Sequence, residues 1–239
     1  MVLQGHENKR AMILAAGLGT RLRPLTNNKP KALVEWQGRP LIDHVIACLS
    51  SYGFREIVIN VHHFADQLIA YIESGNWEGV HITVSHEEDL LLDTGGGLKR
   101  AAPFLEKGPF LVYNVDILSS IDLDRLWHYH LQEGGLVTLA VKERSTSRSL
   151  LLDESGCLKG WRDNRNGDEI LACSDSRGLR PIAYSAIQVM NPAIFKLMPG
   201  EEVFPIMPLL LELAKNYRIT TFRHDADDWA DLGRLEAYS

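Results

Sequence analysis

The hydrophobic positions of the chain fall into two recurring patterns. Short continuous apolar runs are typical of buried strands, whereas apolar residues spaced three or four positions apart are typical of helices that cover a sheet. Between residues 11 and 85 the patterns alternate as strand, helix, strand, helix and strand. This alternation predicts an α/β fold with a doubly wound, mostly parallel sheet, Rossmann-like in its layers.

The same patterns predict elements along the whole chain. Strands are expected over residues 11–15, 56–61, 80–85, 109–115, 136–141, 181–190 and 218–223. Helices are expected over residues 40–51, 64–74, 98–105, 122–133, 192–197 and 205–215. In the helix over 122–133, Asp122 should be the N-cap, and Leu123, Leu126 and Leu131 should face inward. From about 142 to 180, short extended pieces alternate with turns, which predicts a small antiparallel β insertion over the carboxyl edge of the sheet.

Composition and charge narrow the class of protein. A length of 239 residues fits a single domain over 1–239 with a full core. A net charge of −6 argues against binding to nucleic acid or to an anionic membrane. Three cysteines without C-x-x-C spacing argue against a disulfide framework and a zinc site. Residues 1–10 are polar and no apolar run approaches the length of a membrane span, so we expect a cytoplasmic protein.

The segment after the first predicted strand combines flexibility with positive charge. Two glycines and five polar or cationic residues follow that strand: Gly17, Gly19, Thr20, Arg21, Arg23, Lys29 and Lys31. Glycines let backbone N–H groups approach phosphate oxygens, and the cations neutralise them. Leu22 stands where a dinucleotide fingerprint needs its third glycine, and no P-loop motif is present. The residues alone leave two interpretations, a phosphate-binding loop of another kind or a solvated basic loop.

Two later features also suggest a ligand site. Gly95, Gly96 and Gly97 precede a predicted helix, where each costs about 1 kcal/mol relative to alanine. We therefore expect something to approach their backbone closely, the alternative being a flexible entry to the helix. Asp116 follows a predicted strand, at the edge where open α/β sheets bind ligands. Its carboxylate could bind Mg²⁺ or cap a nearby helix.

The glycine-containing loop resembles the signature G-x-G-T-R-[LM]-x-P-x-T-x-x-x-P-K of the sugar-1-phosphate nucleotidylyltransferases. The matching residues are Gly17, Gly19, Thr20, Arg21, Leu22, Pro24, Thr26, Pro30 and Lys31. The resemblance is greatest to short members that act as N-acetylmuramate-1-phosphate uridylyltransferases. Weaker similarity follows in order at Thr94 to Gly97, Asn114 to Asp116, Ser185, and Trp229 to Gly233. The chain departs from the family pattern at Asp93 (usually Glu), Val115 (usually Gly) and Ala186 (usually Gly).

The resemblance implies roles for individual residues. Arg21 would hold the departing pyrophosphate, and Lys31 would neutralise the α-phosphate. The nucleotide would be bound by Leu14, Ala15, Ala16, Gly17, Gly19, Thr20, Thr94, Gly95 and Asn114. Asp116 and Asp231 would be the ligands of Mg²⁺. Arg148 and Ser185 would contact the sugar phosphate, although a solvated Arg148 is an equal alternative.

The implied reaction transfers a nucleoside monophosphate from a nucleoside triphosphate to a sugar 1-phosphate. UTP and N-acetylmuramate 1-phosphate are the first candidates, with residues 11–116 binding the nucleotide and 117–239 the sugar phosphate. Alternatives are a GTP-dependent mannose-1-phosphate guanylyltransferase and a cytidylyltransferase acting on a phosphoalcohol. A nucleotide-sugar-binding regulatory protein is the non-enzymatic alternative. No nucleic-acid or membrane partner is expected, and the oligomeric state does not follow from the sequence.

Overall fold

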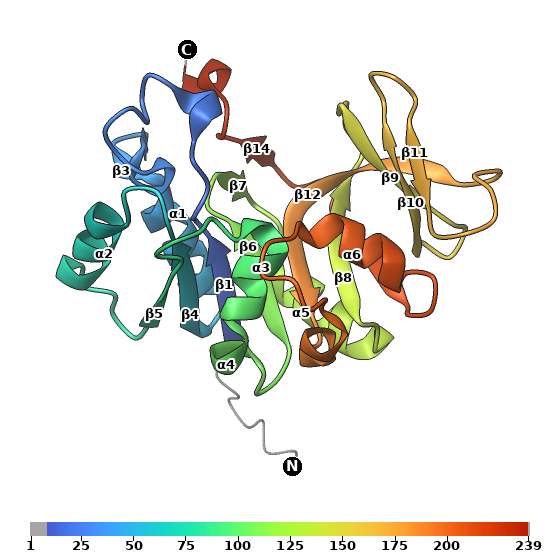
Figure 1. Cartoon of the computed structure of the whole chain (residues 1–239), viewed down its shortest axis with the longest axis horizontal. Helices are drawn as coiled ribbons and strands as arrows, with labels where there is room; N and C mark the ends of the chain where they lie inside the picture. Colours follow the sequence, from blue (N-terminus) through green and yellow to red (C-terminus); the bar gives the residue numbers. More distant parts are fainter. Residues whose placement is uncertain (1–8, 239) are drawn as a thin grey trace.

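The computed structural model of the chain describes residues 9–238 and has a ten-stranded mixed sheet at its centre (Figure 1). The strands are β1 (Lys9–Leu14), β2 (Glu35–Trp36), β3 (Arg39–Pro40), β4 (Phe54–Val61), β5 (His81–His86), β6 (Phe110–Asn114), β7 (Ile117–Ser119), β8 (Val137–Lys142), β9 (Arg148–Leu152), β10 (Leu158–Asp163), β11 (Glu169–Leu171), β12 (Arg180–Met190), β13 (Ile219–Arg223) and β14 (Trp229–Asp231). The α-helices are α1 (Leu41–Ser51), α2 (Ala65–Ser74), α3 (Asp93–Arg100), α4 (Ala102–Leu105), α5 (Leu123–Glu133) and α6 (Ile206–Leu213). Short 3₁₀ helices are η1 (Thr20–Leu22), η2 (Lys31–Leu33), η3 (Pro192–Leu197) and η4 (Leu235–Tyr238).

Strand β1 lies inside the sheet and pairs in parallel with β4 and with β6. Strand β5 continues the parallel half beyond β4. The carboxyl ends of these four strands therefore meet at one edge of the sheet. The long strand β12 runs antiparallel to β6, β8 and β9 and joins this half to the rest of the molecule. The predicted α/β architecture with a mostly parallel sheet is confirmed.

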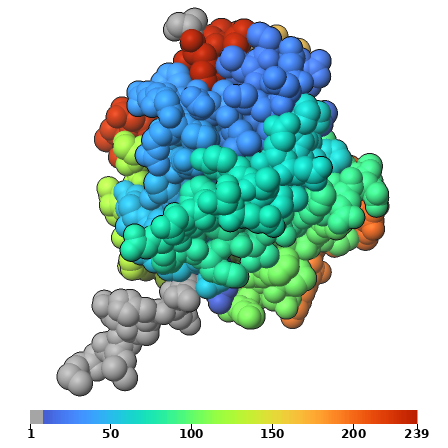
Figure 2. Space-filling view, turned by 90° about the vertical axis from the view of Figure 1, so that its left-hand side faces the viewer, coloured from blue at the N-terminus to red at the C-terminus, as the bar shows by residue number. Residues whose placement is uncertain are grey.

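Helices cover both faces of the sheet, as the alternation of side chains along β1 requires. Ala11 and Ile13 belong to a core that also contains buried residues of α1, α2 and α5. Met12, between them, belongs to a second core shared with α3, α4 and α6. The sheet is therefore doubly wound. Figure 2 shows that the side facing the viewer is formed largely by residues of the first half of the chain.

Helix α5 confirms one sequence expectation and corrects another. The Asp122 carboxylate caps the helix by accepting a hydrogen bond from the Arg125 backbone N–H at 2.9 Å. Leu131, however, is 50% exposed, so the prediction that it faces inward is wrong. Trp127 is buried on that helix instead, and its ring packs edge-on against Phe54 with the centroids 5.4 Å apart. The buried face of α5 is thus formed by Leu123, Leu126, Trp127 and His130.

The predicted antiparallel insertion is present. Strand β9 pairs with β12 and β10, and β10 pairs with β11, all antiparallel. The three strands extend from the end of β12, away from the parallel half (Figure 1). None of the helices within residues 9–238 is long and apolar enough to cross a bilayer. The prediction about residues 1–10 falls almost wholly outside the described residues.

The three consecutive glycines lie inside α3 rather than before it. A Cβ atom at Gly95 would lie 2.3 Å from the Phe204 ring, and one at Gly96 would lie 2.0 Å from the Glu202 carbonyl oxygen. At Gly97 it would lie 2.6 Å from the Glu87 carboxylate. The expected close approach is therefore made by the protein itself, because α3 packs directly on the segment before α6.

Replacing Gly96 by alanine should destabilise the fold. The new methyl group would overlap a backbone carbonyl, which cannot rotate away as a side chain can. Overpacking of this kind costs about 2 kcal/mol, which outweighs the better helix propensity of alanine. The matched control is Gly200→Ala, because a Cβ at Gly200 meets nothing within 4 Å. Urea unfolding of both variants measures the difference, and equal stability would contradict the packing described for α3.

Candidate active site

A cavity of about 470 Å³ lies at the carboxyl ends of β1, β4 and β6. Leu14 ends β1 and is the register neighbour of Asn60 on β4 and of Asn114 on β6. Eight residues predicted from the sequence line this cavity: Leu14, Ala15, Ala16, Gly17, Lys31, Thr94, Asn114 and Asp116. The topology of the parallel half thus gathers residues from four distant segments around one space.

Asn60 lines the same cavity and was missed by the sequence analysis. Its Oδ1 accepts a hydrogen bond from the Ala15 backbone N–H at 2.8 Å, and its Nδ2 donates to Glu87 Oε1 at 2.7 Å. The second Glu87 oxygen accepts from the Leu92 N–H at 2.9 Å. Asn60 therefore fixes the start of the glycine-containing loop relative to the segment before α3. An amide inside the apolar run EIVINV is the sequence signal that could have revealed it.

The glycine-containing loop is held by its own residues. Gly19 has a left-handed backbone with φ of 64°, and its carbonyl accepts a hydrogen bond from Thr26 Oγ1 at 2.8 Å. Gly17 is exposed, and a Cβ there would meet nothing within 4 Å. Thr20 and Arg21 are also exposed, and no hydrogen bond or ion pair holds the Arg21 side chain within the described residues. The structure leaves Gly19, Thr20 and Arg21 outside the lining of the cavity.

Asp116 and Asp231 converge although 115 residues separate them in the sequence. Strand β14 pairs antiparallel with β7, which places Asp231 opposite Ile117, and the Leu232 N–H donates to the Asp116 carbonyl at 2.8 Å. The space beside Gly233, where any other residue would have its Cβ atom, shows how close the side chains of Asp116 and Asp231 are. A Cβ there would lie 2.2 Å from Asp116 Oδ2, 2.8 Å from Asp231 Oδ1 and 3.1 Å from Lys31 Nζ.

The carboxylate pair is partly neutralised by protein cations. Lys31 Nζ forms an ion pair with Asp116 Oδ2, and both side chains are largely buried. Arg234 Nε lies 3.8 Å from Asp231 Oδ2. Burial, followed by the negative charge of the two aspartates, raises the pKa of Tyr238 to about 12. Among residues 9–238 no group of three or more His, Cys, Asp or Glu side chains could hold a metal on its own.

The backbone N–H groups of α3 are less available to a ligand than the sequence suggests. The Gly95 and Gly96 N–H groups both point to the Phe204 carbonyl, at 2.9 and 3.2 Å. The Thr94 hydroxyl accepts a hydrogen bond from the Ile206 N–H at 3.0 Å. These groups join α3 to the start of α6. Thr94 borders the cavity, whereas Gly95 is buried against protein and does not line it.

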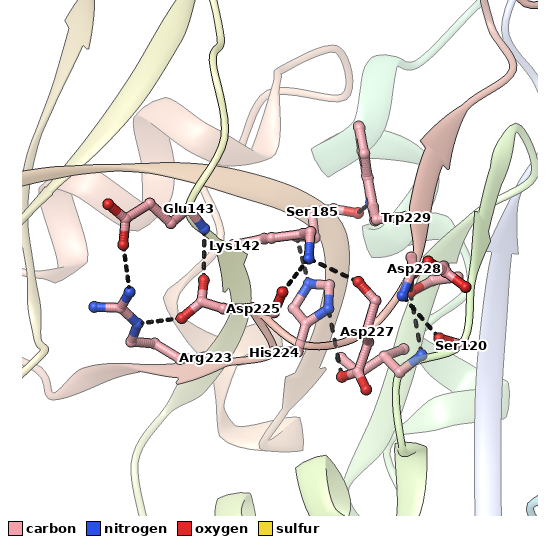
Figure 3. A network of polar contacts seen from close by, with 12 residues as sticks. Ser120, Lys142, Glu143, Ser185, Arg223, His224, Asp225, Asp227, Asp228 and Trp229 are labelled. Atoms are coloured by element: carbon pink, nitrogen blue, oxygen red, sulfur yellow. Dashed lines mark hydrogen bonds and ion pairs between the residues drawn. The ribbon is translucent and has the colours of Figure 1, made fainter.

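Ser185 lies in a buried polar network instead of in a cavity (Figure 3). Its hydroxyl hydrogen-bonds with His224 Nε2 at 2.7 Å, and His224 Nδ1 lies 3.7 Å from Asp227 Oδ2. Burial lowers the pKa of His224, and the Asp227 charge opposes that shift. Ser185, His224 and Asp227 are thus linked as serine, histidine and aspartate, like the catalytic triad of a hydrolase. The sequence did not suggest this arrangement. Ser185 is 0% exposed, so no substrate reaches its hydroxyl.

The network fixes the turn that leads into β14. Trp229 Nε1 donates to the Ser185 carbonyl at 2.9 Å, and Ser120 Oγ accepts from the Asp228 N–H at 2.8 Å (Figure 3). Lys142 Nζ donates to the Asp227 carbonyl at 2.7 Å. The turn is thereby tied to β12, β8 and the residue after β7. Its rigidity sets the position of Asp231, two residues after Trp229.

Ala186 should be replaceable by glycine with a gain in stability. Its φ of 57° lies in the left-handed region, where an L-residue with a side chain costs roughly 1–2 kcal/mol. Glycine removes this cost but loses more entropy on folding, so the net gain should be about 1 kcal/mol. Ala183→Gly, at a buried site of the same strand without positive φ, should instead destabilise. Urea unfolding compares the two, and a loss of stability in Ala186→Gly would contradict the strain.

The two arginines at the base of the insertion differ in their surroundings. Arg148, predicted for the sugar phosphate, is exposed on β9, with its guanidinium 5.8 Å from the centre of the Trp161 ring. Arg144, which the sequence did not single out, is half-buried, with its guanidinium 3.8 Å from the centre of the Trp229 ring. No sequence pattern distinguishes the two. The fold brings Arg144, not Arg148, next to the strand that carries Asp231.

The chain matches a family described as nucleotidyl transferase over residues 10–149, which is more than half of its length. It belongs to this family of enzymes. Two solved structures share the fold over 96% of the chain. HddC from Yersinia pseudotuberculosis, complexed with GMP-PN, has a TM-score of 0.77 at 23% identity over 96% of its own chain. A UDP-glucose pyrophosphorylase complexed with UDP-glucose has a TM-score of 0.76 at 17% identity over 95% of its chain.

Several curated relatives have a higher sequence identity to this chain than these two structures have. The N-acetylmuramate α-1-phosphate uridylyltransferase of Caulobacter vibrioides is 34% identical over 88% of this chain and 86% of its own length. The enzyme of the same name from Neisseria meningitidis is 31% identical over 95% and 94%. The mannose-1-phosphate guanylyltransferase catalytic subunit β of Drosophila melanogaster is 32% identical over 94% of this chain, but the match covers only 59% of that protein.

Proposed function

We propose that the chain transfers UMP from UTP to a sugar 1-phosphate, releasing pyrophosphate. The observation that carries the proposal is the convergence of Lys31, Asp116 and Asp231 at Gly233, beside the cavity at the carboxyl ends of β1, β4 and β6. Membership of the nucleotidyl transferase family supports the reaction type. We assign residues 11–116 to the nucleotide and 117–239 to the sugar phosphate.

The residues at this point fit a magnesium ion. Asp116 and Asp231 present carboxylate oxygens to the same small volume, next to a glycine that leaves it open. Mg²⁺ prefers hard oxygen ligands and binds through one or two carboxylates, with water and substrate phosphates completing the shell. When bound, the ion would neutralise charge on the phosphates during displacement at phosphorus. Asp116 and Asp231 would hold it, and Lys31 would move from Asp116 toward phosphate.

In the proposed reaction an oxygen of the sugar phosphate attacks the α-phosphorus. A new O–P bond forms while the bond to the β-phosphate oxygen breaks, and pyrophosphate leaves with the electron pair. The attacking oxygen is already anionic, so no general base is required. Lys31 would stabilise negative charge on the α-phosphate, and the loop from Gly17 to Arg21 would hold the departing pyrophosphate. The exposed Arg21 is unpaired among the described residues and can turn toward that product.

The choice of UTP and N-acetylmuramate 1-phosphate rests on the two uridylyltransferases, which this chain matches over most of their length. GTP with mannose 1-phosphate is the second candidate, because the guanylyltransferase from Drosophila melanogaster has about the same sequence identity to this chain as the uridylyltransferases have. Val115, where the family pattern has glycine, is 2% exposed and packs in the core. Its backbone N–H donates to the Leu14 carbonyl at 3.2 Å, so this departure leaves Asp116 in place.

A panel of nucleoside triphosphates against sugar 1-phosphates tests the proposal. Pyrophosphate release should require a triphosphate, a sugar 1-phosphate and Mg²⁺ together, and should be fastest with UTP and N-acetylmuramate 1-phosphate. GTP with mannose 1-phosphate as the best pair would replace that substrate choice. Absence of pyrophosphate with every pair, from folded protein, would refute the transferase assignment.

A further inference from the structure

Arg144 lies between β8 and β9 and is held in one orientation. Its planar guanidinium stacks on the Trp229 ring at 3.8 Å, its Nη2 donates to the Tyr184 carbonyl at 2.7 Å, and its Nη1 donates weakly to the Ser145 carbonyl at 3.4 Å. Stacking and a fixed hydrogen bond together restrict a side chain that otherwise has many rotamers. The charge is therefore presented at a defined place rather than spread over the surface.

Among the described residues, Arg144 has no ion-pair partner. Arg162 is paired with Glu169, Arg165 with Asp163, and Arg223 with Glu143 and Asp225. By contrast, within the described part of the chain no carboxylate lies within 4.0 Å of Arg144.

Burial makes this isolation costly. The Nε atom of Arg144 is buried without a hydrogen-bond acceptor, and burial lowers the pKa of the guanidinium while the nearby Asp231 opposes that shift. A half-buried cation with an unsatisfied donor is costly unless an anion joins it. The environment of Arg144 is thus suited to an incoming anion.

Two polar regions meet at Arg144. On one side lies β14, where Trp229 and Asp231 are two positions apart and so point to the same face. On the other side is a second cavity of about 290 Å³, of which Arg144 is the only cationic lining residue among those described. Its walls carry hydroxyl and amide groups from Ser145, Thr146, Ser149 and Asn164, together with Glu143, whose carboxylate is ion-paired with Arg223. Uncharged polar groups of this kind hydrogen-bond to the hydroxyls of a sugar.

We propose that Arg144 binds the phosphate of the acceptor and that the second cavity receives its hydroxyl-bearing ring. The proposal rests on the proposed function, because it assigns the acceptor side of the same site. Asp116 lines the nucleotide cavity, and Asp231, which converges with Asp116, lies near enough for its charge to act on Arg144. An acceptor phosphate at Arg144 would therefore lie beside the carboxylate pair, and the in-line displacement requires its oxygen to attack opposite the leaving group.

Steady-state kinetics of Arg144→Met and Arg144→Lys test the proposal. Methionine keeps apolar contact with Trp229 but removes the charge, and lysine keeps the charge without the planar fork. A hydrogen bond to a charged group contributes about 1.5–3 kcal/mol, so KM for the sugar 1-phosphate should rise roughly 10- to 100-fold in Arg144→Met. KM for the nucleoside triphosphate should stay within about twofold, and lysine should restore part of the acceptor affinity.

The matched control is Arg162→Met, which removes an insertion arginine that is ion-paired with Glu169. This ion pair is only partly buried and neither of its residues lines the second cavity, so the acceptor KM of this variant should remain within about twofold of wild type. An unchanged acceptor KM in Arg144→Met would overturn the inference. A rise in acceptor KM in Arg148→Met without one in Arg144→Met would assign the phosphate to Arg148 instead.

Calorimetric titration with the sugar 1-phosphates separates this proposal from the transferase assignment. If wild type binds an acceptor and Arg144→Met does not, the inference holds even where no pyrophosphate is released. If wild type binds none of them, with or without a non-hydrolysable UTP analogue, the inference is refuted. Thermal unfolding of each variant verifies that the losses arise in a folded chain.

Discussion

Asp116→Asn should lower the rate of pyrophosphate release by roughly 10²–10³-fold, the loss typical of one electrostatic contact to the reacting group. Asparagine has nearly the shape of aspartate, so the contacts around the 4% exposed side chain can persist. What disappears is the negative charge that faces Lys31 and converges with Asp231. Without it, the pair of carboxylates cannot hold a divalent cation at that point. Initial rates at saturating substrates measure the effect.

The control for this variant is Asp124→Asn. Asp124 also pairs with a lysine, Lys9, but lies on α5 and is about half exposed. Its replacement removes the same charge from the chain without touching the carboxylate pair, so activity should be unchanged within about twofold. If Asp116→Asn retains as much activity as Asp124→Asn, Asp116 has no role in the reaction.

Gly233→Ala should reduce activity by a similar factor without removing any functional group. The added Cβ would lie 2.2 Å from Asp116 Oδ2 and 2.8 Å from Asp231 Oδ1, closer than real Cβ contacts allow. It would also lie 3.1 Å from Lys31 Nζ. Three charged groups must therefore move apart, and a misplacement of about 1 Å can cost 10²-fold in rate. Pyrophosphate release at saturating substrates is again the measurement.

Gly200→Ala controls for the loss of a glycine as such, because open space surrounds that position. It should leave both activity and stability near wild type. Circular dichroism and thermal unfolding should show that Gly233→Ala remains folded. Normal activity in folded Gly233→Ala would mean that the convergence of the carboxylates is not needed for turnover.

The parallel half of the fold could be predicted because its sequence patterns are local. The apolar run of β1 and the polar residues at the end of β6 place Leu14, Asn114 and Asp116 at one edge of the sheet without knowledge of tertiary contacts. The pairing of β14 with β7 is different, because it joins segments more than 100 residues apart. Only the family resemblance suggested that Asp231 would reach Asp116.

The glycines of α3 and the serine of β12 show where sequence patterns are ambiguous. Three consecutive glycines indicate close approach, but not whether a ligand or the protein approaches, and here Phe204 and Glu202 do. Ser185 matches the family pattern, yet its hydroxyl is buried in a hydrogen bond with His224, 39 positions away. Burial of a polar side chain depends on partners that its own neighbourhood in the sequence does not show.

Sequence patterns could not show whether Arg144 or Arg148 faces the site. Arg144 and Arg148 are four positions apart in a polar stretch, and nothing in the spacing ranks them. The ranking comes from Trp229, which is 85 residues beyond Arg144 and provides the ring on which it stacks. A long-range aromatic contact thus determines which cation faces the site.

Binding of Mn²⁺ followed by electron paramagnetic resonance tests most directly the claim that Asp116 and Asp231 hold one ion beside a triphosphate. With a non-hydrolysable UTP analogue present, wild type should bind a single Mn²⁺ per chain. Asp116→Asn and Asp231→Asn should each weaken that binding by about tenfold or more, because removing even an outer-shell partner of a metal ligand costs that much. Binding by either variant as tight as in wild type would contradict the shared site.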